Sequence, residues 1–169
     1  MPYALDQFRG IFPAALTMFD RDNNVDEDAT AQHWDWLIRQ GVHGLVITGT
    51  SGEFIALENE ERVRLFKLAK QVTAGRVPLI FGTGHYSTKL TIEMSQAAKA
   101  IGADAVIVIL PYYQKPYKPA VIRHYRDLRR AVDLPIMLYN NPANSACVDL
   151  TPSYFLAQNS LCQEWPDLV

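Results

Sequence analysis

A short segment of small and hydroxyl-bearing residues, Gly-Thr-Ser-Gly-Glu at 49–53, has the composition of an anion-binding loop. Gly49 allows backbone N–H groups to approach a ligand closely, and Thr50 and Ser51 add two hydroxyls. No lysine follows the glycines as it does in a phosphate-binding P-loop, so a carboxylate suits this segment better than a triphosphate. The alternative interpretation is a tight turn between a strand and a capped helix.

Tyr139 ends an apolar run, where its ring can be packed while its hydroxyl stays free. A tyrosine hydroxyl beside a second hydroxyl, such as that of Thr50, could pass protons along a short chain. The alternative is a core tyrosine whose hydroxyl has one hydrogen-bond partner. Tyr112 and Tyr113, which follow another apolar run, have the same two interpretations, and His85 is a further candidate for contact with a substrate.

Composition and spacing argue against several other kinds of ligand. The four histidines are scattered without ligand spacing, so we expect no metal site. A net charge of -2 and a pI near 6.1 give no reason to expect nucleic acid or an anionic membrane surface. The apolar stretches are too short to span a bilayer. Cys147 and Cys162 form no disulfide framework and no signal peptide is evident, so we expect a cytoplasmic protein.

Apolar runs rich in Val, Ile and Leu alternate with helical patterns along the 169 residues. The runs cover 10–17, 42–48, 77–82, 105–110 and 134–139. Helices are predicted from Asp26 or Asp28 to Gly41, from about Asn59, from Ser87 to Gly102, from about Pro119, and from Thr151. Because the runs lie about 30 residues apart, the size of one βα unit, the pattern predicts an α/β domain with a parallel sheet.

Two architectures fit this alternation, an open doubly wound sheet and a (β/α)8 barrel. No Gly-x-Gly-x-x-Gly follows the first run, which weakens the case for a dinucleotide-binding sheet, and we expect no cofactor. In both architectures ligands bind at the carboxyl ends of the strands. The polar segments 49–53, 82–85, 111–113 and 139–142 all follow apolar runs and are therefore expected at one edge of the sheet.

Three of these segments resemble, in this order, motifs of the dihydrodipicolinate synthase and N-acetylneuraminate lyase family. They are Gly-Thr-Ser-Gly-Glu at 49–53, Pro-Tyr-Tyr at 111–113 and Tyr-Asn-Asn-Pro at 139–142. Members are pyruvate-dependent class I aldolases on a (β/α)8 barrel, so the resemblance, which runs from about Phe8 to Pro152, favours the barrel. It also implies a lyase that acts on pyruvate or another 2-keto acid through a Schiff base.

The resemblance implies roles for individual residues. Gly49, Thr50 and Ser51 match the segment that holds the carboxylate of pyruvate. Tyr139 matches the proton-relay tyrosine that works beside the imine-forming lysine. Tyr113 matches the tyrosine that reaches across a dimer interface to complete a neighbour's relay through its threonine. The family is oligomeric, so a homodimer or homotetramer is expected.

Two departures from the family pattern bear on function. By the resemblance, Asn144 looks like the position where dihydrodipicolinate synthase proper has an arginine that binds the second substrate's carboxylate. A neutral amide there makes 2-keto-3-deoxy sugar acids or 4-hydroxy-2-oxo acids at least as suitable as a charged aldehyde. The family's Schiff-base lysine follows the sixth strand, and no lysine in this sequence matches it, since the six lysines fall earlier in helices or in the loop after 105–110.

We therefore expect about the first five βα units of a barrel, with 1–158 as one partial-barrel domain and 159–169 as a divergent C-terminal tail. Five units cannot close an eight-stranded barrel, so an inactive, association-prone chain is expected. The alternative is a catalytically dead half-barrel that binds a partner chain or a small keto acid. A weaker third interpretation is an open-sheet protein with a glycine-rich anion loop.

Overall fold

A computed structural model describes residues 7–146 and 148–151. Four parallel strands form one sheet in the order β1-β2-β3-β4. The strands are β1 (Leu45–Ile47), β2 (Leu79–Gly82), β3 (Ala105–Ile109) and β4 (Ile136–Tyr139). The helices are α1 (Glu27–Arg39), α2 (Asn59–Thr73), α3 (Thr88–Ile101) and α4 (Lys118–Ala131), with a short 3-10 helix, η2 (Phe54–Ala56), after β1. The predicted alternation of helices and strands is confirmed from α1 to β4.

Local sequence signals define most helix ends. The Asp26 side chain accepts a hydrogen bond from the Ala29 N–H and begins α1. At the start of α2, Glu58 and Glu61 form a reciprocal capping box. Gly102 adopts the left-handed conformation that ends α3, as predicted. The helix predicted from Thr151, and the tail at 159–169, lie outside the described residues.

The run at 10–17, predicted as a strand, is only an extended segment beside β1. Ala14 forms a single parallel bridge with Val46, while the Val46 N–H donates to Pro13 O at 3.0 Å. Pro13 has no N–H to donate in return, which limits the ladder at this edge. The segment nevertheless extends the sheet on the β1 side, opposite β4.

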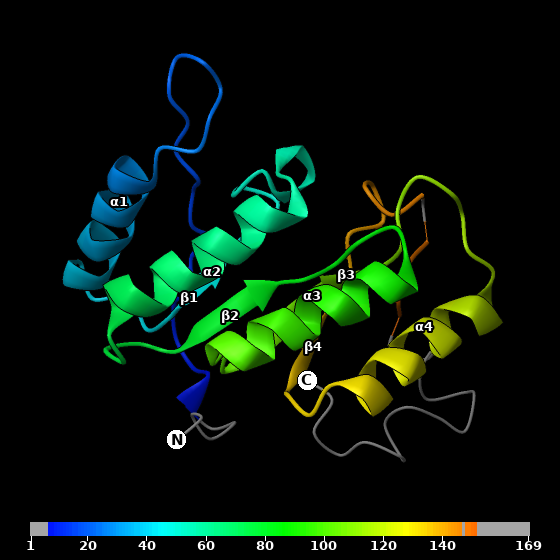
Figure 1. The fold of residues 1–169 in the computed structure, drawn as a ribbon. Coiled ribbons are helices and arrows are strands. Elements are labelled where there is room, and N and C mark those ends of the chain that lie inside the picture. The colour runs from blue at the N-terminus through cyan, green and yellow to red at the C-terminus, as the bar shows by residue number, and fades with distance from the viewer. Residues whose placement is uncertain (1–6, 147, 152–169) are drawn as a thin grey trace.

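The helices cover one face of the sheet, and a core of apolar side chains fills the space between them (Figure 1). α1 packs on α2, α2 on α3 and α3 on α4. This core includes Leu45, Phe81, Val106 and Ile136, which belong to all four strands. The strands therefore point one set of alternate side chains at the helices.

The opposite face of the sheet carries a second, smaller apolar cluster. It contains Val46, Ile80 and Ala105, with Phe8, Phe12, Ile107 and Met137 packed against them. Within the described residues no helix covers this face, and Ile107 and Met137 are half-buried. Ile107 is only half-buried, unlike the other residues of β3, because it faces this uncovered side.

Candidate active site

The loops that follow β2, β3 and β4 gather at one end of the sheet (Figure 1). A cavity of about 480 Å³ extends along the uncovered face to this end. Its floor is apolar, with Val46, Ile80, Ile107 and Met137 from the four strands. Its polar rim comes from the segment after β1 and from the end of β4, which places it at the carboxyl ends of the strands.

The rim brings together residues that are far apart in the sequence. Gly49, Thr50, Ser51 and Tyr139 all line the cavity. The Thr50 hydroxyl lies 3.4 Å from the Tyr139 hydroxyl, across 89 residues of sequence. This pair of hydroxyls can therefore exchange a hydrogen bond, which is the geometry that proton transfer between them requires.

The segment 49–53 is held by hydrogen bonds on both sides. The Gly52 N–H donates to Gly49 O at 3.1 Å, and the buried Thr17 hydroxyl donates to Gly52 O at 2.8 Å. Glu53 is in the left-handed region with φ of 53°, where the chain turns into η2. These contacts fix the small loop that presents Thr50 and Ser51 to the cavity.

The ends of β1 and β2 approach so closely that only glycine fits at position 82. A side chain there would place its Cβ 2.2 Å from the carbonyl oxygen of Thr48. Thr48 itself has a φ of 53°, and its hydroxyl donates to Gly82 O at 2.9 Å. The wall of the cavity beside Thr50 is thus built from two backbones in contact.

A buried arginine, which sequence reasoning did not single out, supports the same wall. Arg62 of α2 is 1% exposed, and its Nη2 donates to Gly82 O at 2.7 Å and to Gly84 O at 3.3 Å. Burial lowers the pKa of Arg62 to about 10, and the nearby Tyr112 opposes this shift. Its position in the helix could have indicated its burial. Residues 62, 65, 66, 69 and 73 form the buried stripe of α2, and Arg62 is the one charged residue in that stripe.

Phe54 and Tyr112 continue the structure beyond Arg62. The Arg62 guanidinium carbon lies 5.4 Å from the centre of the Phe54 ring, which meets the Tyr112 ring edge-on at 5.9 Å. Burial raises the pKa of Tyr112. His85 lies against Tyr86, outside the cavity lining, and burial followed by the Arg62 charge lowers its pKa.

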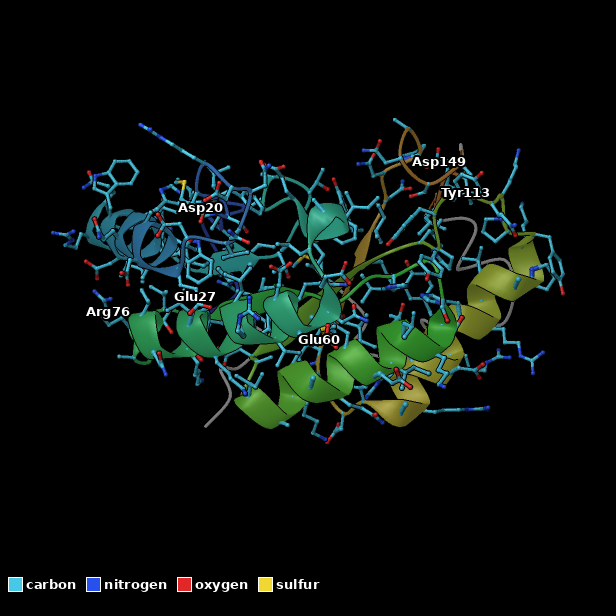
Figure 2. All side chains as sticks on the ribbon, turned by 45° about the horizontal axis from the view of Figure 1, so that its top comes forward. Asp20, Glu27, Glu60, Arg76, Tyr113 and Asp149 are labelled. Carbon is cyan, nitrogen blue, oxygen red and sulfur yellow. The ribbon has the colours of Figure 1, made fainter. Side chains whose placement is uncertain are left out.

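Two other predicted site residues lie away from this cavity. Tyr113 is 93% exposed and lies at the same end of the molecule as Asp149 (Figure 2). It lines a second hollow of about 800 Å³ together with Tyr86 and Tyr117. Asn144 is exposed in the loop after β4, where its N–H donates to Asn141 O at 3.1 Å.

Lysines lie elsewhere in the described chain. All six fall among the described residues, and none lines the 480 Å³ cavity. Lys67 and Lys70 belong to α2, Lys89 and Lys99 to α3, and Lys118 begins α4, which corrects its predicted place in the preceding loop.

Across residues 7–146 and 148–151, no group of three potential metal ligands occurs, and no helix is long and apolar enough to cross a membrane.

Asn141 is a further residue to which the sequence pattern assigned no role. It is half-buried, and its side-chain Nδ2 donates to the Tyr139 hydroxyl oxygen at 3.0 Å. Its neighbour Asn140 donates to Asp149 Oδ1 at 2.7 Å and accepts from the Leu150 N–H at 3.0 Å. The motif at 139–142 therefore contains one asparagine directed to the phenol and one that fastens the following loop.

Parallel βα units with hydroxyl groups at the carboxyl ends of the strands define an α/β protein with a ligand site of the kind found in parallel-sheet enzymes. Comparison with known proteins places the chain more narrowly, because residues 7–160 match the sequence profile of the Dihydrodipicolinate synthetase family. The chain belongs to this family.

Curated relatives agree with this assignment. A 4-hydroxy-tetrahydrodipicolinate synthase of Rhodospirillum centenum is 44% identical over 144 residues, which cover 85% of this chain and 49% of that protein. The same enzyme of Agrobacterium fabrum is 42% identical over 145 residues, covering 86% of this chain and 49% of its own length. The chain thus spans about half the length of the curated relatives that it matches.

Solved structures agree on the fold. YagE, a prophage protein of the dihydrodipicolinic acid synthase family from E. coli K12 solved in complex with pyruvate, superimposes with a TM-score of 0.90 at 39% identity. That match covers 98% of this chain and 54% of the YagE chain. A crystal structure of dihydrodipicolinate synthase gives a TM-score of 0.88 at 37% identity, over 95% of this chain and 54% of the other. The four-stranded sheet is part of a (β/α)8 barrel fold, as the family resemblance implied.

Proposed function

We propose that this chain carries the keto-acid-binding part of a lyase of the aldolase type, which acts on pyruvate or a related 2-keto acid. The observation that carries the proposal is the placement of Thr50, Ser51 and Tyr139 around one cavity, with the two hydroxyls of Thr50 and Tyr139 3.4 Å apart. The pyruvate complex of YagE supports pyruvate as the ligand class. Family membership supports the reaction class.

In the proposed mechanism, the loop at 49–51 binds the carboxylate of the keto acid through its backbone N–H groups and two hydroxyls. The relay pair, Thr50 and Tyr139, moves protons to and from the bound substrate as a carbon–carbon bond forms or breaks. A lysine amine would attack the keto carbon, release water and leave an iminium that accepts electrons. Since none of the six lysines lines the cavity, we expect the chain alone to bind the keto acid without forming this imine.

Asn144 bears on the second substrate. A neutral amide at this position cannot form the ion pair that an arginine forms with a carboxylate. We therefore propose a second substrate without a carboxylate at that end, as in the aldol chemistry of 2-keto-3-deoxy sugar acids or 4-hydroxy-2-oxo acids. Restoring the cation with Asn144→Arg is expected to improve the use of a carboxylate-bearing aldehyde in an active preparation.

A homo-oligomer is part of the proposal. Tyr113, Tyr86, Tyr117 and Ile55 are large apolar side chains that lie exposed around the second hollow. Such a patch is typical of a contact between subunits. Light scattering after gel filtration tests this, and Tyr113→Asp is expected to reduce the size of the assembly.

Borohydride trapping with pyruvate tests the site itself. We expect pyruvate to bind, as measured by ligand-observed NMR, and no borohydride-stable adduct to appear in the intact mass of the chain alone. Ser51→Ala should weaken binding, whereas Ser87→Ala is a matched control because the Ser87 side chain makes no cap hydrogen bond to α3. If the unaltered chain does not bind pyruvate, the proposal is refuted. If borohydride traps an adduct, the chain does contain a lysine that forms the imine.

A further inference from the structure

The Tyr139 phenol has two hydrogen-bond partners, and they differ in what they can do. Asn141 Nδ2 lies 3.0 Å from the phenol oxygen, and Thr50 Oγ1 lies 3.4 Å from it. A carboxamide nitrogen can only donate, whereas a threonine hydroxyl can both donate and accept. The two partners therefore impose different constraints on where the phenolic hydrogen points.

We propose that Asn141 is a positioning residue that fixes the direction of the Tyr139 hydroxyl, an inference that rests on the relay role in the proposed function. The amide N–H occupies a lone pair of the phenol oxygen, so the phenolic hydrogen must point away from Asn141. Thr50 is the remaining partner of the phenol. In the structure the Thr50 hydroxyl donates to the phenol oxygen, and when this hydrogen bond reverses in the relay, the Thr50 oxygen or a ligand oxygen in the same cavity receives the phenolic hydrogen.

The loop geometry keeps Asn141 in this place. Immediately before it, Asn140 is bound to Asp149 and to the Leu150 N–H. Immediately after it, the Asn141 carbonyl accepts from the Asn144 N–H at 3.1 Å, which closes a turn. With the preceding side chain and its own carbonyl both hydrogen-bonded, the half-buried Asn141 is pre-organised toward the phenol, as positioning groups at catalytic sites generally are.

Without the Asn141 donor, the direction of the hydrogen bond between Tyr139 and Thr50 is no longer fixed. The phenol could then rotate its hydrogen away from Thr50, and the pair would spend part of its time in the non-productive arrangement. A donor at position 141 therefore matters for the direction of the proton and not for holding the fold together. An acceptor at the same position would capture the phenolic hydrogen and reverse the arrangement.

Two variants of the full chain separate these cases. Asn141→Asp has the same shape, but an ionised carboxylate can only accept, so the phenol must donate to it. Asn141→Leu removes the hydrogen bond. The reporter is the Cζ resonance of Tyr139 in protein labelled with ¹³Cζ-tyrosine, assigned by its loss in Tyr139→Phe.

We expect Asn141→Asp to move the Tyr139 resonance toward the phenolate position, because the phenol becomes a donor to an anion. We expect Asn141→Leu to give a smaller shift without that direction. A substitution at an exposed position of the same loop, Ala143→Leu, should leave the resonance in place. Thermal melts accompany each sample, so that only variants with an unchanged melting temperature are compared.

An unmoved resonance in Asn141→Asp would overturn the inference, because it would mean that the side chain at position 141 makes no hydrogen bond with the phenol. An equal shift in Ala143→Leu would also overturn it, since the effect would then belong to the loop as a whole. Pyruvate is titrated into the same samples. If pyruvate fails to move the Tyr139 resonance of the unaltered chain, the proposed function fails, and the result for Asn141 is decided independently.

Discussion

Acidification should destabilise this fold through one buried histidine, His124 of α4. Its side chain is 2% exposed, and its Nδ1 lies 2.9 Å from the Thr88 hydroxyl of α3. Its Nε2 is buried and has no hydrogen-bond partner among the described residues. Burial lowers the pKa of His124 from 6.5 to about 4, and the nearby Asp127 opposes this shift.

The sign of the effect follows from the direction of the pKa shift. The fold prefers neutral His124, whereas the unfolded chain takes up a proton below a pH of about 6.5. The unfolded state therefore binds more protons as the pH falls, and stability is lost between 6.5 and about 4. Above pH 7 this residue contributes almost no pH dependence.

The expected loss between pH 7 and pH 5 is about 2 kcal/mol, from the linkage relation for one site with these two pKa values. That is a large share of the roughly 5–15 kcal/mol by which domains are stable. Urea unfolding at both pH values measures it. In His124→Gln, whose amide can still bond with Thr88, the loss between the two pH values should shrink by about 2 kcal/mol.

Other groups also titrate in this range, which is why the comparison uses the difference between two proteins. The pKa of His85 is likewise lowered, but His85 is present in both chains and its contribution cancels. Thr88→Val provides a second check, because it removes the partner of Nδ1 while leaving the histidine. If His124→Gln loses as much stability as the unaltered chain between pH 7 and pH 5, the reasoning is wrong.

Three further predictions concern the walls of the site. Gly82→Ala should lower the melting temperature by several degrees or prevent folding, since its Cβ would lie 2.2 Å from Thr48 O; calorimetry measures this. Arg62→Ala should reduce the free energy of unfolding by about 2–4 kcal/mol, through lost charged hydrogen bonds and a cavity, as measured by urea titration. Asn140→Ala should accelerate hydrogen exchange at the Leu150 amide about fivefold to tenfold while amides of the sheet stay protected.

The fold was predictable because its signals are local. Asp26 before a helical pattern, Gly102 after one, and apolar runs about 30 residues apart each follow from a few neighbouring residues. Parallel strands then bring their carboxyl ends to one edge, so Thr50 and Tyr139 could be expected to meet although 89 residues separate them. The run at 10–17 departed from expectation because Pro13 withholds a donor that a full ladder needs.

The contacts that hold the walls of the site could not be predicted from local sequence patterns. Arg62 reaches Gly82 O and Gly84 O only because β2 ends beside α2, and a sequence pattern shows neither the direction of a long side chain nor the carbonyls it meets. The close contact of Thr48 with Gly82 depends on a left-handed φ at a non-glycine residue. Such dihedral angles are set by the surrounding tertiary structure and not by residue type.

The adjacent residues Asn140 and Asn141 show what a sequence motif cannot predict about a site. Asn140 and Asn141 have the same side chain and the same motif, yet one fastens the loop to Asp149 and the other donates to the Tyr139 phenol. The Asn140 side chain is directed to Asp149 and Asn141, one residue further on, is directed to the phenol, so only one of the two faces it. Which one does so depends on the path of the chain after β4. The family motif therefore predicts where the phenol lies, and the hydrogen bonds around it had to come from the structure.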